Sequence, residues 1–75
     1  MNITEQAAKV LHVLTNTEDR HSRSHIICMN VAGPSNKQLR QAIVKRLTGQ
    51  DLPVSKCGIT YIENLVDAEV KQLTS

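Results

Sequence analysis

The segment His25-Ile26-Ile27-Cys28-Met29-Asn30-Val31-Ala32 decides how the fold of this 75-residue chain is interpreted. It is a short, mostly apolar run, bounded by Ser22 and Ser24 on one side and by Gly33-Pro34 on the other. Its length and its β-branched residues favour a buried strand over a helix. We therefore predict an α+β fold, in which three amphipathic helices pack with one or two short strands.

The first predicted helix precedes this segment. One helical face collects Ile3, Ala7, Val10, Leu11 and Leu14. Asn2 stands three residues before Glu5, a spacing typical of a capped helix start. The polar stretch from Thr15 to Ser24 is predicted to be a loop.

The second predicted helix follows the break at Gly33-Pro34. Ser35 stands three residues before Gln38, which predicts a capping box, and Gly49 is placed to end the helix. The side expected to be buried carries Leu39, Ala42, Ile43 and Leu47.

The last third of the chain is predicted to hold a turn, a second strand and a third helix. Asp51-Leu52-Pro53 is the turn, and Val54 to Ile59 is the strand or the first turn of the last helix. Thr60 stands three residues before Glu63, so we favour a helix that begins near Tyr61. Its apolar stripe is Ile62, Leu65, Val66, Val70 and Leu73. The predicted order is α-β-α-β-α in a single small domain, residues 1–75.

A helix-turn-helix-like variant is the alternative fold for Ser35 to Val66. Ile59, Ile62 and Val66 have the spacing of a buried recognition-helix face. The connection from Gly49 to Ser55 is long for that motif. The acidic residues of the would-be recognition helix also oppose it, because DNA phosphates need cations.

Size and composition make the core marginal. The chain has one aromatic residue, Tyr61, and small domains bury a small fraction of their surface. We therefore expect a homodimer, a view that Glu69 supports because its carboxylate lies within the apolar arc of the last helix. The polar, acidic N-terminus and the lack of a long apolar run predict a cytoplasmic protein that does not enter a membrane.

The charge distribution is the feature that points to function. From Arg20 to Gln50 the chain has six Lys and Arg residues and no Asp or Glu, while both ends are net acidic. A continuous basic segment is typical of a protein that binds a polyanion or an acidic partner.

We predict a small regulator that binds nucleic acid, with duplex DNA favoured because aromatic residues for stacking on single strands are missing. The alternative is an adaptor or inhibitor that covers an acidic patch on a partner protein. The expected binding residues supply charges to phosphates and amides to base edges. They are Arg20, Arg23, Lys37, Gln38, Gln41 and Lys45.

Other chemistry is disfavoured. Residues Ile26 to Lys37 suggest a strand, a Gly turn and a helix that could hold one anion, but the Walker pattern is absent. His21, His25, Cys28 and Cys57 do not have a standard zinc spacing, so we expect no metal, no cofactor and a buried Cys28. Cys57 beside Lys56 has no histidine placed to act as a base, and we expect no enzyme activity.

Overall fold

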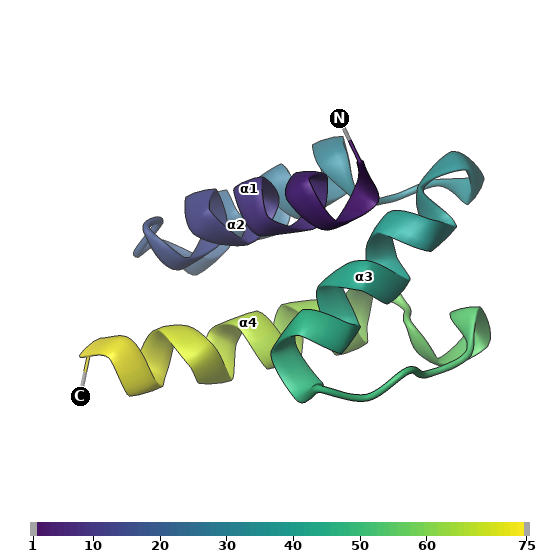
Figure 1. Cartoon of the computed structure of the whole chain (residues 1–75). Helices are drawn as coiled ribbons and strands as arrows, with labels where there is room; N and C mark the ends of the chain where they lie inside the picture. Colours follow the sequence, from purple (N-terminus) through teal and green to yellow (C-terminus); the bar gives the residue numbers. More distant parts are fainter. Residues whose placement is uncertain (1, 75) are drawn as a thin grey trace.

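The structure, a computed structural model, describes residues 2–74 and is helical throughout (Figure 1). Its helices are α1 (Ile3–Thr15), α2 (Arg20–Asn30), α3 (Lys37–Thr48) and α4 (Ile59–Thr74), with two short 3-10 helices, η1 (Pro34–Asn36) and η2 (Val54–Lys56). In Figure 1 the pair α1 and α2 lies on one side of the molecule, and α3 and α4 lie on the other. α3 packs against α1 and α4, and α2 packs against α4.

The predicted α+β fold is wrong, because residues 2–74 contain no strand. The segment from His25 to Ala32 lies almost wholly in α2, and Val54 to Ile59 forms η2 and then the start of α4. The predicted loop from Thr15 to Ser24 is also shorter than expected, because only residues 16–19 connect α1 to α2.

α2 forms because its start is capped and its buried side has a helical spacing. The Asp19 carboxylate accepts a hydrogen bond from the Ser22 backbone N–H at 2.8 Å, which satisfies one of the free donors of the first turn. Arg23, Ile27 and Val31 are buried and stand four residues apart. The first position of this stripe is an arginine, so hydrophobicity alone did not reveal it.

α1 is confirmed together with its cap. The Asn2 Oδ1 atom accepts a hydrogen bond from the Glu5 backbone N–H at 2.8 Å. Ala7, Leu11 and Leu14 are buried against the other helices, as their spacing predicts.

The predicted end of α3 is confirmed, but its predicted start is wrong. Gly49 closes the helix in the left-handed region, with φ 76°, where glycine has no steric penalty. Ser35 lies in η1 and does not cap α3, and Asn36 is the N-cap without a side-chain capping bond. The Asn36 side chain instead donates to the Ala32 carbonyl at 2.8 Å.

α4 begins at Ile59, so Thr60 lies inside its first turn and the predicted box with Glu63 is wrong. The buried stripe is largely as predicted, with Ile62, Val66 and Val70 inside and Leu65 half-buried. Leu73 was expected in that stripe and is 63% exposed. The helix is therefore anchored along its first three turns and ends in solvent.

The core is aliphatic, apart from one cysteine. It consists of Ala7, Leu11, Leu14, Ile27, Val31, Leu39, Ile43, Val44, Cys57, Ile62, Val66 and Val70. Residues 49–58 separate α3 from α4, which is longer than the three- or four-residue turn of a helix-turn-helix. Within residues 2–74, none of the helices has both the length and the apolar character needed to cross a bilayer.

Candidate functional site

Both arginines of α2 pair with Asp67 of α4, and one of them is buried. Arg23 is 6% exposed, and its Nη1 atom donates to the carbonyls of Thr17 and Glu18, both at 2.7 Å. Its Nη2 atom lies 3.0 Å from Asp67 Oδ1. Arg23 was predicted to contact a ligand, but its guanidinium is buried and bonded to groups of its own chain.

Arg20 shares the same carboxylate. Its Nε atom lies 3.0 Å from Asp67 Oδ2, although its side chain is 72% exposed. A second polar contact joins the same two helices, because the Ser24 hydroxyl donates to the Glu63 carboxylate at 2.8 Å. The two arginines in the α2 part of the predicted site therefore share one carboxylate of α4, which offsets one of their two positive charges.

Two further polar side chains of the basic segment hold the fold together. Arg40 donates from Nη1 to the carbonyls of Val31 and Gly33, at 2.8 and 2.7 Å, and from Nε to the Cys57 carbonyl at 3.2 Å. Gln41 was predicted to bind a ligand, but its Nε2 atom donates to the Leu52 carbonyl at 3.1 Å. Its amide is thus partly occupied.

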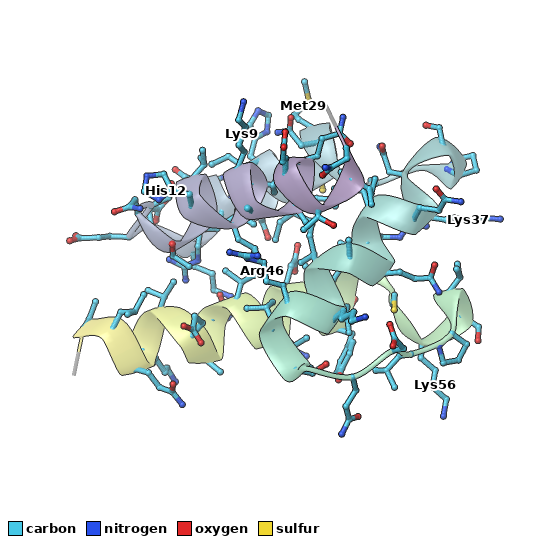
Figure 2. The ribbon with its side chains drawn as sticks, viewed as in Figure 1. Lys9, His12, Met29, Lys37, Arg46 and Lys56 are labelled. Carbon is cyan, nitrogen blue, oxygen red and sulfur yellow. The ribbon has the colours of Figure 1, made fainter. Side chains whose placement is uncertain are left out.

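The exposed side of α3 carries three basic side chains that reach solvent. Lys37, Gln38, Lys45 and Arg46 are all exposed, and α3 contains no Asp or Glu. Lys37 projects away from the helices at the start of α3 (Figure 2). Lys45 pairs with Asp51 at 3.2 Å, but both side chains are more than half exposed, so the pair contributes about 0–1 kcal/mol.

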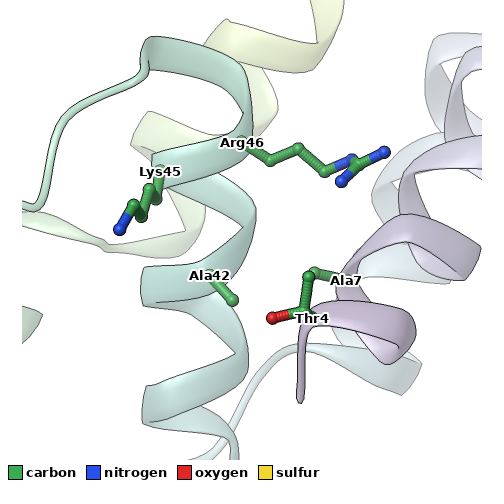
Figure 3. A pocket seen from close by; sticks show the side chains of 5 residues that line it. All are labelled: Thr4, Ala7, Ala42, Lys45 and Arg46. Atoms are coloured by element: carbon green, nitrogen blue, oxygen red, sulfur yellow. The ribbon is translucent and has the colours of Figure 1, made fainter. Parts of the chain in front are cut away.

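A hollow between α1 and α3 is bordered by two of these basic residues. This α1–α3 hollow is lined by Thr4, Ala7, Ala42, Lys45 and Arg46 and has a volume of about 410 Å³ (Figure 3). The two alanines leave it open because they are small. Arg46 reaches across toward α1, while Lys45 leaves α3 in the opposite direction (Figure 3). Among the described residues, no carboxylate lines this hollow.

A second hollow lies at the start of α3, and we call it the η1 hollow. Its volume is about 420 Å³, and its lining consists of Ile3, Pro34, Ser35, Lys37, Gln38, Gln41 and Val54. The structure therefore brings three predicted residues into one hollow and places Lys45 beside the other. Arg20 and Arg23 lie apart from both hollows, against α4.

Two residues of this surface were not predicted from the sequence. Arg46 belongs to the basic segment, but it was not assigned to the binding side of its helix. Thr4 carried no signal at all, because a hydroxyl on the first turn of a helix is ordinary. Its hydroxyl group faces α3 in Figure 3, and a hydroxyl can donate a hydrogen bond.

Among the cysteines and histidines, Cys28 is placed differently from the prediction, while Cys57, His21 and His25 are placed as expected. Cys28 is exposed on α2, where burial was expected, and Cys57 is buried at 1% exposure. His21 and His25 are exposed on α2. Within residues 2–74, no group of three or more His, Cys, Asp or Glu side chains is arranged to hold a metal ion. The strand that the sequence suggested before Gly33, as part of a disfavoured anion-binding turn, is absent because α2 occupies that segment.

Hydrogen bonds hold the pKa of Asp19 below its ordinary value of 3.8. The largest cause is the Ser22 hydroxyl, which donates to the Asp19 carboxylate at 2.8 Å, followed by the Ser22 backbone N–H at the same distance. Asp19 caps α2 and takes no part in the α1–α3 hollow.

Comparison with known proteins finds no relative: no family model, no curated protein sequence and no solved structure matches this chain. Function is therefore inferred from the chemistry of the α3 surface.

Proposed function

We propose that the protein is a regulator that binds nucleic acid through the exposed side of α3, with duplex DNA as its ligand. The observation that carries the proposal is the α1–α3 hollow, where two cations and a hydroxyl line an open space with no carboxylate among the described residues. A phosphate group has only acceptor oxygens and a negative charge, so this lining is complementary to it.

Each side chain of the hollow has a distinct part in holding a phosphate. The Arg46 guanidinium donates in a planar fork that matches two phosphate oxygens. Thr4 supplies a hydroxyl donor from α1. The Lys45 side chain leaves α3 in the opposite direction, so its charge is available to a neighbouring phosphate. A bound phosphate would compete with Asp51 for Lys45. Asp51 is a weak competitor because its ion pair with Lys45 is exposed.

The η1 hollow extends the surface along α3. Lys37 and Lys45 are separated by about 12 Å along the helix axis, because each residue rises 1.5 Å. That separation suits phosphates on different nucleotides. Gln38 lies between them, is exposed, and has an amide that is able to contact a base edge.

Duplex DNA is favoured over single strands because stacking residues are missing from this surface. The one aromatic residue, Tyr61, is 38% exposed and lies on α4, outside the lining of both hollows. Proteins that bind single strands obtain much of their affinity from bases stacked on aromatic rings.

A salt titration against random-sequence duplex DNA tests the proposal. The test variant is Lys37→Ala/Lys45→Ala/Arg46→Ala. The control is Lys9→Ala/Lys56→Ala/Lys71→Ala, which removes the same charge from exposed residues that have no ion pair within residues 2–74. We expect the slope of log K against log salt to fall by roughly three in the test variant and by much less in the control. Equal losses in both, or no binding by the unmodified protein at low salt, would contradict the proposal.

A second variant tests the hollow without changing charge. Ala42→Leu fills the α1–α3 hollow, and Ala68→Leu adds the same group at an exposed position of α4. We expect Ala42→Leu to lose about one unit of salt slope, because one phosphate is displaced. Ala68→Leu should bind like the unmodified protein.

An adaptor or inhibitor that covers an acidic protein patch is the second candidate. The observation that favours it is the mixed lining of the η1 hollow, where Ile3, Pro34 and Val54 accompany Lys37. Protein interfaces combine apolar contacts with arginine and lysine in this way. This candidate predicts partner capture that survives nuclease treatment and is lost in the Lys37→Ala/Lys45→Ala/Arg46→Ala variant.

The homodimer and the cytoplasmic location stay predictions. Glu69, one reason to expect a dimer, lines a hollow with Arg46 and His12 of its own chain, so it does not require a second copy. Sedimentation equilibrium tests the dimer, and a single 8.3 kDa species at high protein concentration would exclude it.

A further inference from the structure

A third hollow lies where α1, α3 and α4 meet. This three-helix hollow has a volume of about 320 Å³ and is lined by Ala8, Leu11, His12, Thr15, Arg46, Leu47 and Glu69. Leu11 is buried and Leu47 half-buried, so they give the hollow an apolar part. The ionisable groups come from three different helices, with His12 on α1, Arg46 on α3 and Glu69 on α4. The Arg46 side chain also borders the α1–α3 hollow.

The two opposite charges of the three-helix hollow are not paired with each other. Within residues 2–74, neither Glu69 nor Arg46 makes a side-chain hydrogen bond or an ion pair. Glu69 is half-buried, and a carboxylate that is withdrawn from water without a partner raises the free energy of the folded protein. A ligand that offers a cation to Glu69 and an anion to Arg46 would satisfy both groups.

His12 adds a second donor for an anion. Its Nδ1 atom lies 3.4 Å from the Asn16 side-chain nitrogen, which is able only to donate. In the tautomer in which Nδ1 accepts this bond, Nε2 carries the proton. The Nε2–H group is the donor that His12 offers to a ligand.

We propose that the three-helix hollow binds a small zwitterion of the α-amino-acid type. The ligand carboxylate bonds to Arg46 and His12, its ammonium group bonds to Glu69, and its side chain contacts Leu11 and Leu47. A simple anion is disfavoured by Glu69, and a simple cation by Arg46. This inference goes beyond the proposed function, because it requires no nucleic acid.

Three related probes distinguish these possibilities by heteronuclear NMR titration. L-leucine carries both charges, N-acetyl-L-leucine only the negative one, and L-leucinamide only the positive one. We expect L-leucine to shift the Leu11, His12 and Leu47 resonances saturably. The affinity of each of the other two probes should be lower by about tenfold, since each lacks one charge-assisted hydrogen bond.

Two variants assign the charges. Glu69→Gln should remove the preference for L-leucine over N-acetyl-L-leucine, while Arg46→Gln should remove the preference for L-leucine over L-leucinamide. Glu5→Gln is the control, because Glu5 is an exposed carboxylate at the start of α1. Circular dichroism verifies that each variant is folded.

Three outcomes would overturn the proposal. They are equal shifts from all three probes, no shifts at millimolar concentration, and an unchanged preference in Glu69→Gln. A failure here leaves DNA binding untouched, because the titration contains no DNA. A failure of DNA binding likewise leaves the amino-acid titration interpretable.

Discussion

The basic segment has two halves with opposite roles, one on α2 and one on α3. On α2, Arg23 is buried and Arg20 is paired, both on the Asp67 carboxylate of α4. On α3, Lys37 and Arg46 are exposed without an ion pair among the described residues. The difference lies in the neighbouring helix, since α2 packs against the acidic residues of α4 while the exposed side of α3 borders small residues of α1. A basic segment of the sequence thus forms a basic surface only where the neighbouring helix does not pair its charges.

The largest effect on stability is expected from a substitution in the α2 half of the basic segment. Arg23→Ala leaves the Thr17 and Glu18 carbonyls without their donor and leaves the Asp67 carboxylate with Arg20 as its remaining cation. Removing one partner from a buried pair costs about 3 kcal/mol, a large part of the stability of so small a protein. Chemical denaturation measures this. Arg20→Ala removes an exposed charge from the same carboxylate and should cost less than about 1 kcal/mol. Equal losses of stability in the two variants would contradict the different roles assigned to the buried Arg23 and the exposed Arg20.

A smaller effect, of pH on local stability, is expected at the starts of α2 and α3. α2 depends on the ionised Asp19 cap, whereas α3 has no side-chain cap. Because folding lowers the pKa of Asp19, its contribution to stability is complete above the unfolded pKa near 3.8. It is lost as the pH falls through the lower folded value.

We therefore expect acid to open the first turn of α2 before that of α3, which NMR of the Ser22 and Leu39 amides would follow. Asp19→Asn keeps a capping side chain and should remove the acid sensitivity of that turn. An α3 start that responds to acid in the same range would contradict this assignment.

A modest gain in DNA affinity is expected when the weak ion pair on α3 is removed. Asp51→Asn frees Lys45 from its exposed partner and removes a negative charge near the α1–α3 hollow. Affinity for duplex DNA should rise several-fold at low salt and converge with the unmodified protein at high salt. Glu18→Gln removes the same charge from the α1–α2 connection and serves as the control. A larger gain from Glu18→Gln would place the DNA on the α2 side.

The smallest effect concerns the stability of the α3 surface. Lys37→Ala/Lys45→Ala/Arg46→Ala removes three exposed side chains, none of which lies in the core. We expect its denaturation midpoint to stay close to that of the unmodified protein, since exposed substitutions have little effect on stability. A clear destabilisation would mean that Arg46 supports the contact between α1 and α3.

The sequence predicted the regular helices and missed the one with an arginine in its buried stripe. α1 and the end of α3 follow from apolar spacing, from Asn2 and from Gly49, all of which act locally. α2 was interpreted as a strand because Ile26 and Ile27 stand out, while the buried role of Arg23 depends on Asp67, forty-four residues further along. A partner that distant leaves no periodic signal.

The candidate site was predicted only in part, because some of its contacts join residues that are far apart in the sequence. Lys37, Gln38 and Lys45 lie on the exposed side of α3, which a helical projection gives. The internal bonds of Arg23 and Gln41, and the position of Thr4 and Arg46 along one hollow, depend on how the helices pack. Those contacts follow from tertiary structure and were not accessible from the sequence alone.

The Arg40 side chain forms hydrogen bonds to two connecting segments that are far apart in the chain. Its guanidinium bonds to the carbonyls of Val31 and Gly33, before α3, and of Cys57, before α4. Neither connection can therefore separate from α3 without breaking bonds to the same side chain. In amide hydrogen exchange, the ends of α2 and η2 should behave as one cooperative unit, with matching opening free energies, despite their distance along the chain.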